Sequence, residues 1–262
     1  MNKYYLPTYE ECVNITKKYP PKTFYESKKL YDNYRFSFFN YRLAEYKHFL
    51  ESNAFEMKGI TFLHTKDKKY RYLMFNKFWE LDQYSEFKYD NFKNKKIKKI
   101  MIKEDGNLVS FIKLPNSKII SRVKGGFKTI FNESANKFLY KNIKYYNFVE
   151  WCLDNEIIPL FEIVGKNRIV LEYKKDNLIL LNLRNNINGE YIDIDNIDYN
   201  MDGINIVKTE NLSFDDIIEL SKTKKYFEGW VVQFEDDTLL KVKTKWYQEM
   251  KNYIIEKLKE EK

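Results

Sequence analysis

Lys103-Glu104-Asp105-Gly106 is the stretch from which the fold can be read, because an extended, apolar-rich segment lies on each side of it. Residues 100–103 have a strand-like pattern, and residues 108–112 resume that pattern after the turn signal Asp105-Gly106. The pattern predicts two strands joined by a tight turn, with Lys103 at the end of the first strand. Gly106 suits a tight turn beneath a bound ligand, because glycine has no Cβ.

Lys103 is a candidate nucleophile in this position. An amine must be deprotonated to attack, and the unperturbed pKa of lysine is about 10.4, so a reactive lysine needs partial burial or neighbouring cations. Lys124, Lys241 and Lys243 can supply these cations if the strands that carry them lie beside Lys103. The alternative is a solvent-exposed hairpin turn, which is the more frequent meaning of such a tetrapeptide taken alone.

Two carboxylates lie in or beside apolar strands. Glu162 interrupts the apolar run of residues 160–164, where a carboxylate is costly unless it faces a ligand, a cation or water. Glu228 begins the run Glu228-Gly229-Trp230, and near a phosphate it can bind Mg²⁺ directly or through water. The alternatives are a solvated sheet face for Glu162 and an ordinary strand-initiating glutamate for Glu228.

Lys241 and Lys243 alternate with apolar residues, which predicts that both ammonium groups lie on the same face of a strand. Two like charges side by side are unfavourable unless an anion meets them. A triphosphate is such an anion, and a solvated lysine face is the alternative.

The composition predicts a folded, basic protein. The chain has 262 residues, 44% of them hydrophobic, which is enough for a core, and a net charge of +8. A basic chain suggests a polyanionic partner such as nucleic acid, although a solvated lysine-rich surface is also consistent with the charge. Cys12 and Cys152 are too far apart in the sequence for a metal or redox motif, which favours a reduced, intracellular protein.

No apolar run approaches the roughly 20 residues that span a membrane, and the first seven residues lack the apolar core of a signal peptide. We therefore expect a soluble, cytoplasmic protein without a membrane partner. The sequence also lacks a Walker phosphate loop and a dinucleotide fingerprint. His48 and His64 form no zinc signature with the cysteines, and no motif supports a Ser-His-Asp triad.

Hydrophobic periodicity predicts an α+β fold with antiparallel sheets, because strands and helices are mixed without regular βαβ alternation. Helices are predicted for residues 8–18, 134–154, 214–222 and 246–258. Extended segments are predicted for residues 34–41, 59–64, 70–75, 100–103, 108–112, 119–124, 160–164, 169–173, 178–183, 230–234 and 239–243, and a polar loop for residues 186–200.

The order of these motifs resembles that of a known family, the ATP-dependent RNA ligases of the T-even phage RNA ligase 1 type, within the covalent nucleotidyltransferase superfamily. Six segments between Lys103 and Tyr247 carry the resemblance, and it extends from about residue 34 to residue 247. The segments are Lys103 to Ser110, Asn167 to Leu171 with Ile179 to Arg184, Gly189 to Ile192, Glu228 to Val231, and Lys241 to Tyr247.

The resemblance implies a nucleotidyltransferase (ligase adenylation) domain with antiparallel sheets flanked by helices. It implies one domain over residues 1–262, made of an N-terminal part to about residue 95, a motif-bearing core over residues 96–245 and a C-terminal helix over residues 246–262. It also leads us to expect that the family's C-terminal helical domain is absent, since the sequence stops at Lys262.

The family's site residues carry over by position. Lys103 would form a lysine–AMP adduct, Glu162 would hold the ribose, Glu228 would serve Mg²⁺ (or Mn²⁺), and Lys241 and Lys243 would bind phosphates. Further ATP contacts are implied for Phe39, Lys58, Lys77, Lys124 and Tyr247. Lys58 replaces a family arginine, which keeps the charge but loses bidentate phosphate geometry, and Phe39 replaces a family tyrosine.

The implied function is ATP-dependent joining of a 5′-phosphate RNA end to a 3′-hydroxyl RNA end, through lysine–AMP and RNA-adenylate intermediates. The implied setting is RNA or tRNA repair, with cleaved tRNA as one substrate and a phage-like origin; the sequence does not give the oligomeric state. The alternatives are another covalent nucleotidyltransferase, either a DNA ligase or an mRNA guanylyltransferase, and a non-catalytic RNA-binding protein on the same fold.

Overall fold

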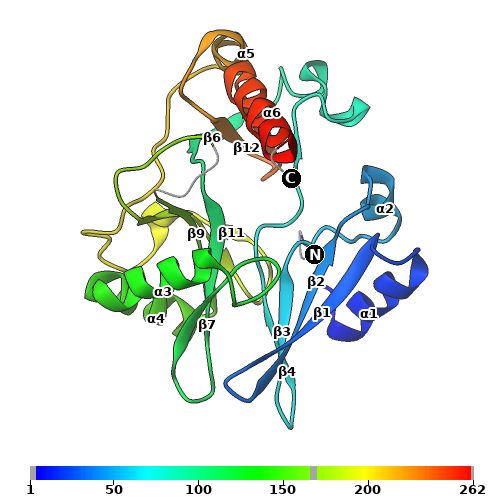
Figure 1. Cartoon of the computed structure of the whole chain (residues 1–262), viewed down its shortest axis with the longest axis vertical. Helices are drawn as coiled ribbons and strands as arrows, with labels where there is room; N and C mark the ends of the chain where they lie inside the picture. The colour runs from blue at the N-terminus through cyan, green and yellow to red at the C-terminus, as the bar shows by residue number, and fades with distance from the viewer. Residues whose placement is uncertain (1–3, 166–169, 261–262) are drawn as a thin grey trace. The chain divides into compact units, whose positions relative to one another are not determined.

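The structure is a computed structural model of the chain, and it describes residues 4–165 and 170–260 (Figure 1). Its α-helices are α1 (Tyr9–Lys18), α2 (Tyr46–Glu51), α3 (Ile130–Lys141), α4 (Ile143–Asp154), α5 (Phe214–Thr223) and α6 (Lys245–Glu260).

The strands of the described residues form three sheets. The first sheet has the order β1 (Phe24–Tyr31), β2 (Tyr34–Tyr41), β3 (Ile60–His64), β4 (Lys69–Tyr72). The second has the order β11 (Tyr191–Ile192), β10 (Asn177–Asn185), β9 (Ile157–Val164), β7 (Asn107–Lys113), β8 (Ile119–Arg122). The third has the order β5 (Trp79–Glu80), β13 (Leu239–Lys243), β12 (Gly229–Phe234), β6 (Ile97–Lys103). This confirms the predicted α+β class, although β5 pairs with β13 in parallel.

The chain divides into two compact units. The first comprises residues 1–77, 107–163 and 178–205 and contains the first and second sheets. The second comprises residues 78–106, 164–177 and 206–262 and contains the third sheet with α5 and α6. The organisation into a single domain with boundaries near residues 95 and 245 stays a prediction.

Aromatic packing joins the two sheets of the first unit. Phe127 follows β8, and its ring centroid lies 4.7 Å from that of Phe36 and 5.0 Å from that of Phe38, both on β2. Ile112 and Ile120 from the second sheet belong to the same buried cluster. Helices α3 and α4 pack against β7 and β8 of the second sheet (Figure 1).

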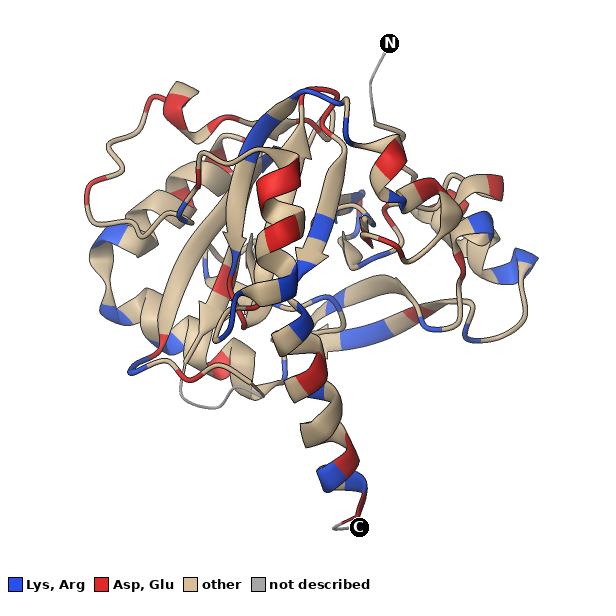
Figure 2. Ribbon diagram, turned by 90° about the horizontal axis from the view of Figure 1, so that it is seen from above, with Lys and Arg blue, Asp and Glu red and all other residues tan. Residues whose placement is uncertain are grey.

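Two predicted helices begin where the sequence places their caps. Thr8 caps α1 and Ser213 caps α5, and in each case the capping box is complete, with the partner carboxylate from Glu11 or Asp216. The predicted C-terminal helix is also confirmed as α6, along which basic and acidic residues alternate (Figure 2). Within residues 4–165 and 170–260, no helix is both long and apolar enough to cross a bilayer.

The single helix predicted for residues 134–154 is wrong, because Asn142 divides it into α3 and α4. Asn142 has an extended backbone, with φ −124° and ψ 92°. Its side-chain amide donates to the carbonyl of Phe138 at 2.6 Å, and its backbone N–H donates to Leu139. An asparagine that bonds the preceding turn in this way competes with continuation of the helix.

The strand predicted for residues 169–173 is also wrong where it can be judged. Ile169 lies outside the described residues, and residues 170–173 form no strand. The backbone N–H of Leu171 donates to the carboxylate of Asp105 at 2.8 Å instead of entering a sheet ladder.

Three strands, β1, β5 and β11, lack a counterpart in the sequence prediction. The first is β1, most of whose residues are partly or fully exposed, so its pattern reads as polar, although it pairs with β2 along its whole length. The second is β5, which has only two residues. Strand β4 is shorter than predicted, and the polar loop predicted for residues 186–200 contains the short β11.

Candidate active site

Strand register in the second unit aligns three lysines on one face of the third sheet. Gly229 of β12 lies directly opposite Lys103 of β6 on one side and Lys243 of β13 on the other. Lys241 lies two residues before Lys243 and therefore shares its face. We call Lys103, Lys241 and Lys243 the lysine face; it confirms that Lys241 and Lys243 lie on one side of their strand.

Gly229 is required at the centre of this row. Its φ is +148°, and a Cβ built there would lie 2.1 Å from the carbonyl oxygen of Val242 and 2.7 Å from the Cα of Lys243. Both neighbours are backbone atoms, so they cannot move aside as a side chain can. The absence of a side chain at residue 229 thus lets β12 and β13 approach beside the lysine face.

Lys103 and Glu228 form an ion pair with 2.7 Å between Nζ and Oε1. The lysine side chain is 21% exposed and the glutamate side chain 5%. Burial raises the pKa of Glu228, and the charge of Lys103 opposes this shift without cancelling it. The second oxygen, Oε2, is buried and has no hydrogen-bond partner among the described residues, so Glu228 retains an acceptor for a further ligand.

Glu80 is a site residue that the sequence prediction missed. It lies opposite Lys241 and forms an ion pair with Lys243. Burial acts to raise the pKa of Glu80, but the hydrogen bond from Lys243 and the charges of Lys243, Lys241 and Lys103 outweigh it, and the net pKa is lowered. All three members of the lysine face therefore act on one carboxylate.

Lys241 is held beside the short strand β5 by Phe78, the residue directly before that strand. Its Nζ donates to the carbonyl of Phe78 at 3.3 Å and lies 4.5 Å from the centroid of the Phe78 ring. The only signal in the sequence for this part of the site is that Phe78 directly follows Lys77, a residue that the family resemblance singles out.

Asp105 anchors the turn that follows Lys103. Its Oδ1 accepts a hydrogen bond from the Tyr247 hydroxyl at 2.8 Å, and its Oδ2 accepts from the N–H of Leu171. Its own N–H donates to the hydroxyl of Tyr173 at 2.9 Å, and that hydroxyl donates to Glu104 at 2.9 Å. Tyr173 was predicted only as a strand residue, so its part in this network was missed.

Tyr247 and Tyr173 are held as neutral phenols beside these carboxylates. Burial raises the pKa of each phenol, and the charge of a nearby glutamate raises it further, Glu228 for Tyr247 and Glu104 for Tyr173. A neutral phenol is a hydrogen-bond donor, which is the role that both side chains have here.

Four other predicted residues lie close together in the first unit. The Phe39 carbonyl accepts the N–H of Gly59, which directly follows Lys58. A Cβ on Gly59 would lie 2.9 Å from the Cα of Lys124, so these segments touch. Phe39 itself is fully buried.

Tyr41 lies close to Lys77, the fourth residue of this group, and also to Lys124. The ammonium of Lys77 lies 5.0 Å from the Tyr41 ring centroid. Burial raises the pKa of Tyr41, and the charge of Lys124 opposes the shift, as expected for a neighbour. Glu162 belongs to the same unit, on β9 opposite Leu108, and is buried.

Glu228 is the carboxylate best suited to meet a metal, because of its orphaned oxygen. In the described part of the chain, no group of three or more His, Cys, Asp or Glu side chains is placed to hold a metal ion. A single protein carboxylate fits Mg²⁺, which commonly takes its other ligands from substrate phosphates and water.

The family model described as RNA ligase matches residues 56–252, well over half of the chain. The chain therefore belongs to this RNA ligase family, as the order of its motifs predicted.

Solved structures agree with this assignment at the level of fold. Two archaeal ATP-dependent RNA ligase structures, forms 2 and 1, superpose with TM-scores of 0.61 and 0.59, each at 12% identity. Each match covers 94% of this chain and 63% of the archaeal chain, so this chain spans less than two thirds of those proteins. A Naegleria gruberi RNA ligase mutant with ATP and Mn is similar at a TM-score of 0.49 and 14% identity, over 62% of this chain and 53% of that one.

Proposed function

We propose that the protein is an ATP-dependent RNA ligase that joins a 5′-phosphate RNA end to a 3′-hydroxyl RNA end. The observation that carries the proposal is the ion pair of Lys103 with Glu228 beside Lys241 and Lys243, in a chain of the RNA ligase family. A lysine among other lysines at the end of a strand is suited to attack a phosphate, because the neighbouring cations attract the anion and stabilise its charge.

In the first step, Nζ of Lys103 attacks the α-phosphorus of ATP. A P–N bond forms, the bond to the bridging oxygen breaks, pyrophosphate leaves, and the amine gives up a proton to solvent. Lys241 and Lys243 are assigned to the phosphates, where their charge offsets that which develops on the leaving group. Glu80 holds Lys243 in place until the nucleotide arrives.

In the second and third steps the AMP group moves to the 5′-phosphate of one RNA end, and the 3′-hydroxyl of another end then displaces AMP. The products are a phosphodiester and free AMP, and Lys103 is restored. When bound, Mg²⁺ or Mn²⁺ would supply charge stabilisation on the phosphates, with Glu228 as its protein ligand.

Further roles follow by position from the family. Glu162 is assigned to the ribose of ATP, and Tyr247 to ATP binding, which we take to act through its support of the turn after Lys103. Phe39, Lys58, Lys77 and Lys124 are assigned to the nucleotide and its triphosphate. The hydrogen bond from Tyr247 to Asp105 gives the second assignment a physical basis.

Incubation with α-labelled ATP and Mg²⁺ tests the proposal. The wild-type protein is expected to acquire a covalent label, and Lys103→Ala to acquire none, because the nucleophile is missing. Lys99→Ala is the matched control, since it removes a lysine from the same strand. No label on the wild type, or a label that persists in Lys103→Ala, would contradict the proposal; labelling by GTP in place of ATP would point to a guanylyltransferase.

RNA repair, with cleaved tRNA as one substrate, is the setting we propose. Nicked tRNA, unstructured RNA and nicked duplex DNA, offered with ATP, test this separately from the labelling. We expect joining of the RNA substrates and no joining of the DNA.

A further inference from the structure

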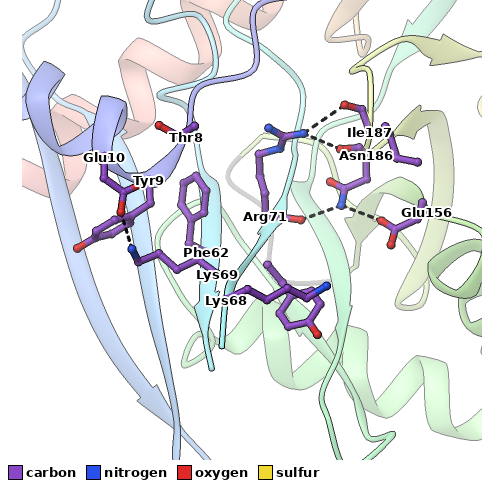
Figure 3. A pocket seen from close by; sticks show the side chains of 11 residues that line it. Thr8, Tyr9, Glu10, Phe62, Lys68, Lys69, Arg71, Glu156, Asn186 and Ile187 are labelled. Carbon is purple, nitrogen blue, oxygen red and sulfur yellow. Dashed lines mark hydrogen bonds and ion pairs between the residues drawn. The ribbon is translucent and has the colours of Figure 1, made fainter. Parts of the chain in front are cut away.

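An open cavity of about 560 Å³ lies in the first unit, and none of its lining residues is among those assigned to ATP (Figure 3). It is bordered by the start of α1, by the β3–β4 hairpin and by the residues that follow β10. Basic and aromatic side chains dominate the side formed by the hairpin and α1 (Figure 3). Its chemistry is therefore cationic and aromatic at the same time.

Two lysines on the hairpin each cover an aromatic ring. The ammonium of Lys68 lies 4.1 Å from the ring centroid of Tyr70, and that of Lys69 lies 4.5 Å from the ring centroid of Tyr9. Tyr70 is 41% exposed. Each pair thus presents a cation and a π-face at the same point of the cavity.

These pairs can be exchanged for contacts with a ligand, because they are exposed. Cation–π contacts are weak at exposed sites, and so are exposed ion pairs such as that of Lys69 with Glu10, whose side chains are 37% and 66% exposed. A phosphate can therefore replace the ring as the partner of a lysine at little cost in free energy, and the uncovered ring face can then stack on a base.

Arg71, on the same strand as Lys69, joins the hairpin to the residues that follow β10. Arg71 donates to the carbonyl oxygens of Asn186 and Ile187 at 3.0 and 3.3 Å, and the Asn186 amide donates back to the Arg71 carbonyl at 2.7 Å (Figure 3). Asn186 also donates to Glu156. The guanidinium charge is thereby held in one place, while the two lysines that precede it on the hairpin are exposed and adjustable.

We propose that this cavity binds single-stranded RNA, with Lys68 and Lys69 on the phosphates and Tyr70 stacked on a base. The cations of the lining are Lys68, Lys69 and Arg71, and one of the two carboxylates, Glu10, is already paired with Lys69. The exposed ring of Tyr70 beside two adjacent lysines suits the alternation of base and phosphate in a strand. The inference rests on the proposed function, since it assigns to the RNA substrate a surface whose lining residues differ from those assigned to ATP.

Fluorescence anisotropy with a labelled, unstructured RNA oligonucleotide tests this, in the absence of ATP. The double variant Lys68→Ala/Tyr70→Ala is expected to lose about tenfold in affinity, from one stacking contact and one phosphate contact. The matched control is Lys257→Ala/Tyr253→Ala, which removes another exposed cation–π pair, 5.1 Å apart, from α6. Both changes remove one positive charge and one tyrosine.

We expect less than about a twofold change for the control, because non-specific attraction depends on total charge. An equal loss in the two double variants would overturn the proposal. Displacement of the RNA by excess AMP would also overturn it, in favour of a site for a free nucleotide. Labelling by ATP is measured on the same samples: an unlabelled wild type with a selective loss of RNA binding refutes the ligase reaction and leaves the RNA site standing.

Discussion

Two ion pairs, one in each unit and each with a buried carboxylate, differ in how completely their hydrogen bonds are satisfied. In the first unit Arg184 is fully buried and grips Glu56 with both terminal nitrogens, at 2.8 and 2.5 Å, while its Nε donates to the Gly189 carbonyl. In the second unit a single contact joins Lys103 to Glu228, and the other carboxylate oxygen is buried and accepts no hydrogen bond from any residue that the structure describes.

The pKa shifts of Arg184 and Glu228 differ in the same way as their hydrogen bonding. Burial acts to lower the pKa of Arg184, but the Glu56 carboxylate outweighs it and the net pKa is raised. For Glu228 burial outweighs the attraction of Lys103. A saturated pair stabilises the folded chain, whereas an unsaturated pair keeps part of its binding capacity for a ligand.

The matched substitutions Glu56→Gln and Glu228→Gln test this contrast and should give the largest difference in stability. Glu56→Gln leaves the charge of Arg184 buried and uncompensated, so we expect a loss of about 3 kcal/mol in the free energy of unfolding. Glu228→Gln removes a carboxylate whose burial is unfavourable, so a change below about 1 kcal/mol is expected, with loss of labelling by ATP. Urea denaturation measures both, and equal losses in the two variants would refute the contrast.

Gly229→Ala extends the comparison to the backbone beside the reactive pair. The new methyl group would meet the Val242 carbonyl, so we expect a loss of about 2 kcal/mol or more, together with loss of labelling by ATP. Gly125→Ala is the control, because a Cβ there has no atom within 4 Å. Thermal unfolding of the two variants decides, and a Gly229→Ala protein as stable as Gly125→Ala would contradict the close approach of β12 and β13.

Tyr173→Phe should have the smallest effect of these substitutions, and it tests the hydrogen bonds that hold the turn after Lys103. It removes the hydroxyl that links Asp105 to Glu104. We expect the transition state of the labelling step to lose about 1 kcal/mol of stabilisation, so that labelling is slowed by roughly 5- to 10-fold at unchanged ATP affinity. Tyr226→Phe is the control, since that side chain is 80% exposed. A Tyr173→Phe protein that is labelled as fast as this control would show that the hydroxyl does not position the turn.

Much of the fold could be predicted because local chemistry determines it. Helices α1 and α5 lie within one residue of their predicted ranges, with Thr8 and Ser213 as side-chain caps, and the strands around Lys103 follow from the apolar pattern and the Asp105-Gly106 turn. Asn142 is the instructive failure. The hydrophobic periodicity continues through it, whereas a side-chain hydrogen bond to the preceding turn ends the helix there.

The site was predicted where it depends on residues within strands and missed where it depends on register or on loops. The pairing of Lys103 with Glu228 joins two residues that the motifs singled out. Glu80 comes to the lysine face through a two-residue strand that has no periodicity to detect. Tyr173 reaches Asp105 from a segment whose apolar pattern is typical of a strand.

The hydrogen bond from Tyr247 to Asp105 has a consequence for labelling and tethering the protein. Tyr247 is the third residue of a 16-residue helix, so the far end of α6 lies about 20 Å away along the helix axis. Helices fray from their ends, and unwinding of the last turns leaves the first turn intact. A dye or surface linker attached near Lys259 therefore leaves the turn after Lys103 undisturbed. One attached within the first turn of α6 would act directly on the hydrogen bond from Tyr247 to that turn.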